Sequence, residues 1–128
     1  MRVTSVGLTR FKSSPLTRAT LRGAQYIGHD TPLARVRAAA QSAQEPGLTY
    51  LYLRDVDKIG HAEGWESEEW VAQFEKIDDQ LDTLRRLAPR GTAIVVVADH
   101  GMVAADPAER IDIALDPCLL YTSDAADD

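Results

Sequence analysis

Two pairs of aspartate and histidine are the residues in this sequence best suited to chemistry. Asp57 and His61 lie in the stretch DKIGH, directly after the largely apolar TYLYLRDV. Asp99 and His100 open the stretch DHGM, directly after the apolar AIVVVA. Carboxylate oxygens and imidazole nitrogens are both good ligands of zinc. The two pairs therefore predict a binding site for divalent metal ions such as zinc.

The spacing within each pair limits how the side chains can share an ion. Asp57 and His61 are four positions apart, so both point to one face if the loop makes a helical turn. Asp99 and His100 are adjacent and can share an ion only in a bend, which the following Gly101 would help to form. An aspartate after a strand is more often a helix cap or a turn former. Either pair alone is therefore weak evidence, and the metal hypothesis depends on both together.

Alternating strands and helices are expected to position these pairs. Ser14 and Thr31 are each followed by a proline, which predicts the N-cap and the first residue of a helix. The third and longest helix is indicated by apolar residues at steps of three and four. The predicted strands cover residues 3–7, 25–27, 48–56 and 93–98, and the predicted helices cover 15–22, 32–44 and 67–88.

The long helix and the strands on either side of it bear directly on the site. Its apolar stripe predicts one buried face, and the apolar run 93–98 is typical of a strand covered on both faces. A strand, a long helix and a second strand predict a parallel crossover unit. Parallel strands end on the same edge of a sheet, where ligands of open α/β sheets bind. The two pairs should therefore meet there. The stripe consists of Trp70, Phe74, Ile77, Leu81 and Leu84.

Composition excludes some classes of function. The 128 residues are 45% hydrophobic, which suits one small domain or a piece of a larger one, and no apolar run is long enough to cross a membrane. The net charge of −6 and a pI near 5.0 argue against a binder of nucleic-acid polymers, because phosphate contacts need a basic face. The first eleven residues lack the pattern of a signal peptide. A cytoplasmic location is favoured, and the start is expected to be incomplete.

The last eleven residues, CLLYTSDAADD, do not continue the preceding pattern. They resemble the translation of an adapter used in sequencing libraries, so residues 118–128 are interpreted as a non-native tail that should pack poorly. Residues 1–117 are interpreted as a fragment of a catalytic domain. The tail holds three aspartates and the single cysteine, and without it 17 acids against 14 bases leave a charge of −3. Thiol chemistry is therefore not expected.

The two motifs together resemble a known family. YLRDVDKIGH, a long helix and IVVVADHGM, in that order, are similar to the type I phosphodiesterase and nucleotide pyrophosphatase family of the alkaline phosphatase superfamily. The stretch RFKSSPLTRATLRG also looks like an upstream segment of bacterial members. The resemblance implies an α/β fold with three α/β/α layers, incomplete here, with parallel strands joined by crossover helices.

The resemblance also implies ligands and a substrate class. Asp57 and His61 would bind one zinc ion, and Asp99 and His100 would bind the other. Asp55 does not have the spacing of the family motif and is not expected to be a ligand. The substrate would be a small phosphate ester, such as a nucleotide, attacked by a threonine or serine hydroxyl with the help of two metal ions.

This hydroxyl nucleophile and the remaining metal ligands are expected to lie outside the chain. None of the hydroxyls near the start has the expected context of an aspartate-bearing strand end, and His29 is interpreted as a solvated loop residue. The chain alone is therefore predicted to be inactive. The hydroxyls considered are those of Thr4, Ser5, Ser13, Ser14 and Thr17.

Two alternatives remain at this point. Another member of the superfamily, such as a phosphomutase or a sulfatase, would use similar ligands on a different ester. A non-catalytic α/β binding module would use the aspartate and histidine pairs only to shape loops. Metal content distinguishes the enzymes from the binding module.

Overall fold

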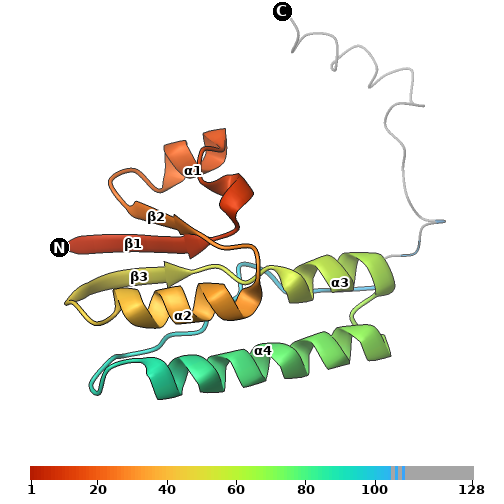
Figure 1. Ribbon diagram of the computed structural model, residues 1–128. Coiled ribbons are helices and arrows are strands. Elements are labelled where there is room, and N and C mark those ends of the chain that lie inside the picture. The colour runs from red at the N-terminus through yellow and green to blue at the C-terminus, as the bar shows by residue number, and fades with distance from the viewer. Residues whose placement is uncertain (105, 107, 109–128) are drawn as a thin grey trace, which may run out of the picture.

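The described residues form a three-stranded parallel sheet with helices packed alongside it (Figure 1). The computed structural model describes residues 1–104, 106 and 108. The strand order is β2-β1-β3, with Thr4 opposite Gln25 on one side and opposite Thr49 on the other. This confirms the predicted α/β class and is consistent with part of an alkaline-phosphatase-like fold. The strands are β1 (Arg2–Gly7), β2 (Gln25–Gly28) and β3 (Gly47–Leu51).

Helices follow the strands, and each predicted helix is present. Ser14, Thr31 and Ser67 are N-caps whose hydroxyls accept a hydrogen bond from the backbone N–H three residues later. These caps satisfy backbone donors that the first turn of a helix leaves free. The helical elements are η1 (Thr9–Phe11), α1 (Pro15–Thr20), α2 (Pro32–Ser42), α3 (Asp55–Glu63) and α4 (Glu68–Leu87). No helix in the described part of the chain is both long enough and apolar enough to cross a membrane.

The cap of α4 gives a first testable prediction. The hydroxyl of Ser67 accepts from the Trp70 N–H at 3.1 Å and donates to the Gly64 carbonyl at 2.7 Å. Ser67→Ala removes both bonds, and we expect the free energy of unfolding to fall by about 1 kcal/mol. Denaturant unfolding followed by circular dichroism measures the change. Ser13→Ala, at an exposed position, is the control; equal stability of the two variants would contradict the role of the cap.

The core lies between the sheet and α2. Val6 of β1 is buried against Ala38 and Ala39 of α2, and Ile27, Leu51 and Leu84 pack around this cluster. Small alanine side chains let α2 approach the sheet closely. Leu84 brings the end of α4 to the same cluster, so α2, α4 and the sheet share one core.

The apolar stripe of α4 is less buried than predicted. No residue of α4 is fully buried, and Phe74 is 54% exposed. The Phe74 ring stacks on Trp70 with centroids 5.2 Å apart, which shields only one side of it. The predicted buried face is therefore only half-buried, because the described elements cover part of the stripe: Trp70, Ile77, Leu81 and Leu84 are half-buried and Phe74 is exposed.

The predicted strand 93–98 is absent. The segment is extended without strand pairing, and Val95, Val96 and Val97 are 80%, 68% and 78% exposed. It runs back past the helices, so β3 stays at the edge of the described sheet and the predicted crossover unit does not form (Figure 1). The strand prediction is therefore wrong, because strand pairing depends on tertiary context that sequence pattern alone does not fix. The predicted tail, residues 118–128, lies outside the described residues.

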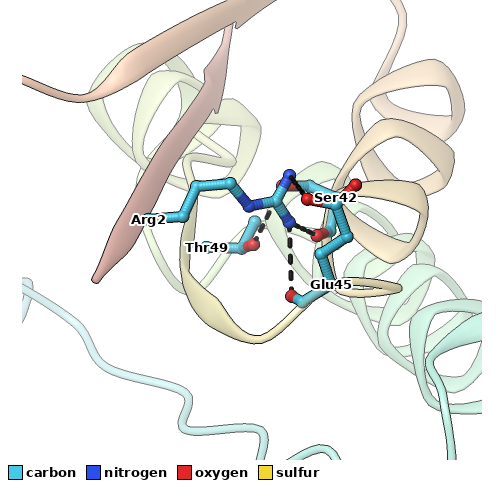
Figure 2. Close-up of polar contacts among 4 residues, drawn as sticks. All are labelled: Arg2, Ser42, Glu45 and Thr49. Carbon is cyan, nitrogen blue, oxygen red and sulfur yellow. Dashed lines mark hydrogen bonds and ion pairs between the residues drawn. The ribbon is translucent and has the colours of Figure 1, made fainter.

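A polar cluster joins the first strand to the turn between α2 and β3 (Figure 2). The Arg2 guanidinium donates to the backbone carbonyl of Ser42 and to that of Glu45 at 3.2 Å, and it pairs with the Glu45 carboxylate at 3.3 Å. The Thr49 hydroxyl donates to the Ser42 hydroxyl at 3.3 Å. The bond from Arg2 satisfies the Ser42 carbonyl at the C-terminal end of α2, where no further helical turn supplies a backbone N–H.

Candidate metal centre

Helix α3 presents the first pair on one face. The strand predicted over 48–56 ends at Leu51, and the chain turns into α3 at Asp55. The four-residue step between Asp57 and His61 therefore spans one helical turn, and His61 Nε2 lies 3.2 Å from Asp57 Oδ1. Asp57 is in the first turn, where the helix dipole favours a carboxylate. The helical turn that the sequence required for this pair is present.

The second pair reaches the first through extended chain. His100 Nε2 lies 3.7 Å from Asp57 Oδ1 and 3.7 Å from Asp99 Oδ1. Asp57 Oδ1 thus lies close to both histidines, one from each motif. The pairs meet as predicted, but without the strand that was expected to bring them together.

Gly60 and Met102 connect the two motifs. Gly60 is buried in α3, and a Cβ placed there would overlap the Met102 sulfur and methyl group and approach the Trp70 ring at 3.2 Å. The absence of a side chain at Gly60 therefore makes room for Met102. Met102 is two residues after His100, so this contact holds the DHGM segment against α3.

Hydrogen bonding fixes which His100 nitrogen faces Asp57. His100 Nδ1 lies 2.9 Å from the Gly101 carbonyl oxygen, and a carbonyl only accepts, so Nδ1 is the donor. In the neutral ring, Nε2 then carries the lone pair that a metal requires. This hydrogen bond is also the main cause that raises the pKa of His100 above its ordinary value, followed by the carboxylate of Asp99; Asp57 adds a smaller increase.

A second group near the site is also perturbed. Burial is the main cause that raises the pKa of Tyr52, and the nearby Arg54 opposes it. Asp57 and Asp99 add further increases, because negative charge disfavours the phenolate. The pKa of Tyr52 therefore depends on carboxylates of both motifs.

The donor chemistry of this cluster fits a divalent cation. Asp57 Oδ1 is shielded from solvent and has no hydrogen bond within the described chain, although two imidazoles lie nearby. A buried carboxylate oxygen without a partner is costly, and a cation would satisfy it. Within the described residues, however, no group of three or more histidine, cysteine, aspartate or glutamate side chains is arranged to hold a metal ion. The side chains of the two pairs lie close together, but their donor atoms do not surround one position for an ion. Their role as metal ligands therefore stays a prediction.

The other residues singled out in the sequence lie elsewhere or are engaged. His29 is exposed in a loop, as interpreted. Thr4 and Ser5 are buried in β1, with 1% and 2% exposure. The Ser14 hydroxyl caps α1 and donates to the Thr17 hydroxyl. Ser13 is exposed.

Sequence reasoning missed Arg35 and Met102. Arg35 lies on the buried face of α2 together with Ala38 and Ala39, and it pairs with Asp55. A charged residue inside an apolar helical stripe was the available signal, because such a residue needs a buried partner. Met102 gave no signal of its own, since contact with Gly60 depends on the tertiary fold.

Comparison with known proteins supports the motif resemblance. The family model of type I phosphodiesterase / nucleotide pyrophosphatase matches residues 9–124, which reach into the segment interpreted as a tail. Neither the search of curated proteins nor that of solved structures gave a match. The match covers both motifs and most of the chain, and it favours the phosphodiesterase interpretation over the phosphomutase and sulfatase alternatives. The chain therefore belongs to the type I phosphodiesterase / nucleotide pyrophosphatase family.

Proposed function

We propose that the parent enzyme of this chain hydrolyses phosphoric diesters or pyrophosphates at a two-zinc centre that includes Asp57, His61, Asp99 and His100. Membership of the family itself implies phosphodiesterase- or pyrophosphatase-type hydrolysis of phosphate esters, and the family typically uses metal ions. Our proposal goes beyond family membership in three assignments: these four residues as ligands, zinc as the metal and nucleotides as substrates.

The observation that supports this proposal most directly is the position of Asp57 Oδ1. It lies 3.2 Å from His61 Nε2 and 3.7 Å from His100 Nε2, and it is shielded from water without a hydrogen bond. Two imidazole nitrogens, one from each motif, lie beside this oxygen, and a bound cation would complete its coordination.

Each residue has a defined task in this proposal. Two bound metal ions would stabilise the attacking and leaving oxygens at phosphorus. Asp57 supplies negative charge between the two motifs, and the Gly101 carbonyl orients the His100 ring by accepting from Nδ1. Asp99 has an 88% exposed side chain and remains free to turn toward an ion.

We further propose that the nucleophilic hydroxyl and the remaining ligands come from residues outside this chain. Of the hydroxyls near the start, Thr4 and Ser5 are buried, Ser14 and Thr17 bond to each other, and the exposed Ser13 does not follow an aspartate-bearing strand end. A catalytic zinc normally has three protein ligands and one open position, whereas two are proposed here for each ion.

This proposal predicts zinc binding without substantial turnover. The purified 128-residue chain should bind zinc in a calorimetric titration and should hydrolyse a chromogenic phosphodiester at a negligible rate with excess zinc. The variant carrying both Asp57→Ala and His100→Ala should lose zinc binding and keep the same negligible rate.

Two outcomes would contradict the proposal. Absence of zinc binding by the unaltered chain would reject the metal centre. Robust turnover that the double variant abolishes would show that a nucleophile lies within the chain, and would reject its assignment to residues outside.

A further inference from the structure

The ion pair between Arg35 and Asp55 is the most deeply buried charge contact of the described chain. The Arg35 side chain is 1% exposed, and its Nη2 donates to Asp55 Oδ2 at 3.0 Å. The Nε and Nη1 atoms of Arg35 are buried and have no hydrogen-bond partner among the described residues. Moving the Asp55 carboxylate away from Arg35 would be costly, because it would leave the buried guanidinium charge uncompensated.

The pair joins a fixed helix to a weakly defined helix start. Arg35 lies on α2, whose neighbouring Ala38 and Ala39 pack in the core. Asp55 is the first residue of α3, and the N-cap position before it, Arg54, makes no capping hydrogen bond through its side chain. The start of α3 therefore has no side-chain N-cap, and the ion pair between Asp55 and Arg35 of α2 fixes it instead.

The start of α3 determines where the first metal pair points. Asp57 follows Asp55 by two residues, and His61 lies one turn further along the same helix. Each residue of an α-helix advances the side-chain direction by about 100°. A shift of one residue at the start would turn both side chains away from His100.

We propose that Arg35 and Asp55 are positioning residues of the candidate metal centre, and that their ion pair fixes the start and rotation of α3 so that Asp57 and His61 face His100. The effect on zinc affinity that this inference predicts rests on the proposed function. Its geometric part, the position of α3, is independent of any metal.

The test uses the 128-residue chain with Asp55→Asn, which keeps the size of the side chain and removes its charge. Two quantities are measured: zinc affinity by titration with zinc chloride, and the imidazole resonances of His61 and His100 by NMR without metal. We expect zinc affinity to fall about tenfold, as for outer groups that orient ligands. We also expect the His61 resonances to shift in the metal-free protein.

The matched control is Asp82→Asn, which breaks an exposed pair with Arg85 and Arg86 on α4. It should leave both readouts unchanged. Arg35→Lys keeps the charge but loses the planar fork, and it should give a smaller change of the same sign. If the Asp55→Asn variant does not fold, the Arg35→Lys variant tests the proposal.

The outcomes separate the two proposals. Folded Asp55→Asn and Arg35→Lys variants with unaltered His61 resonances would overturn the positioning role, whatever their zinc affinity. If the unaltered chain binds no zinc but Asp55→Asn shifts the His61 resonances, the metal centre is rejected and the positioning of α3 stands.

Discussion

The zinc affinity of the chain should fall by about 100-fold or more when Asp57 is replaced by asparagine, which exceeds the effect of losing an outer group that only orients a ligand. Asparagine keeps the shape of the side chain but removes its charge. Asp57 Oδ1 is the oxygen close to both His61 and His100. Its charge therefore acts on both motifs, whereas among the described histidines the Asp99 carboxylate pairs only with His100, its neighbour in the same motif.

Calorimetric titration with zinc chloride measures this effect. Asp99→Asn should lower zinc affinity less than Asp57→Asn, because the Asp99 side chain is 88% exposed and water can replace it. Asp78→Asn, at an exposed position of α4, makes the same chemical change away from the site and should leave the affinity unaltered. Equal affinities for all three variants would show that Asp57 is not a ligand.

Replacing Gly60 by valine should both destabilise the fold and separate the motifs. The added side chain would occupy the space of the Met102 side chain and press on Trp70. Overpacking of this kind typically costs about 1–3 kcal/mol of stability. The displaced Met102 would carry His100 away from Asp57, so zinc affinity should fall as well.

Denaturant unfolding and zinc titration together test this expectation. Ala72→Val, at an exposed position of α4, is the control, because it adds side-chain bulk away from both motifs. Shortening Met102 to alanine in the Gly60→Val background should recover part of the lost stability, since the two residues compete for one space. If Gly60→Val retained full stability and zinc affinity, the contact would not hold the motifs together.

Local signals allowed most of the fold to be predicted. The serine and threonine caps followed by proline placed the starts of α1 and α2, because capping is a short-range interaction between a side chain and the backbone. Ser67 and the apolar periodicity placed α4. Strands β1, β2 and β3 were recognised from short apolar runs, although β3 ends before the predicted boundary.

Properties that depend on distant neighbours were not predictable. Residues 93–98 have strong strand preferences, yet pairing requires a neighbouring strand in register. Arg35 is a charged residue on the buried face of α2, but its partner, the half-buried Asp55, lies 20 positions away and could not be identified from sequence. The meeting of Asp57 and His100 was predicted correctly, but through strand ends, whereas the structure achieves it through α3 and the packing of Met102 on Gly60.

The exposed valine run has a consequence for how this protein behaves in concentrated solution. Residues 93–98 combine β-branched side chains with no charge and no proline, and Val95 to Val97 are exposed. β3, at the edge of the described sheet, presents backbone groups to which another strand can add. An uncharged, extended segment and an open edge in one molecule favour intermolecular strand addition and aggregation. Dilute samples, or a lysine in place of Val96, should therefore keep the chain monomeric.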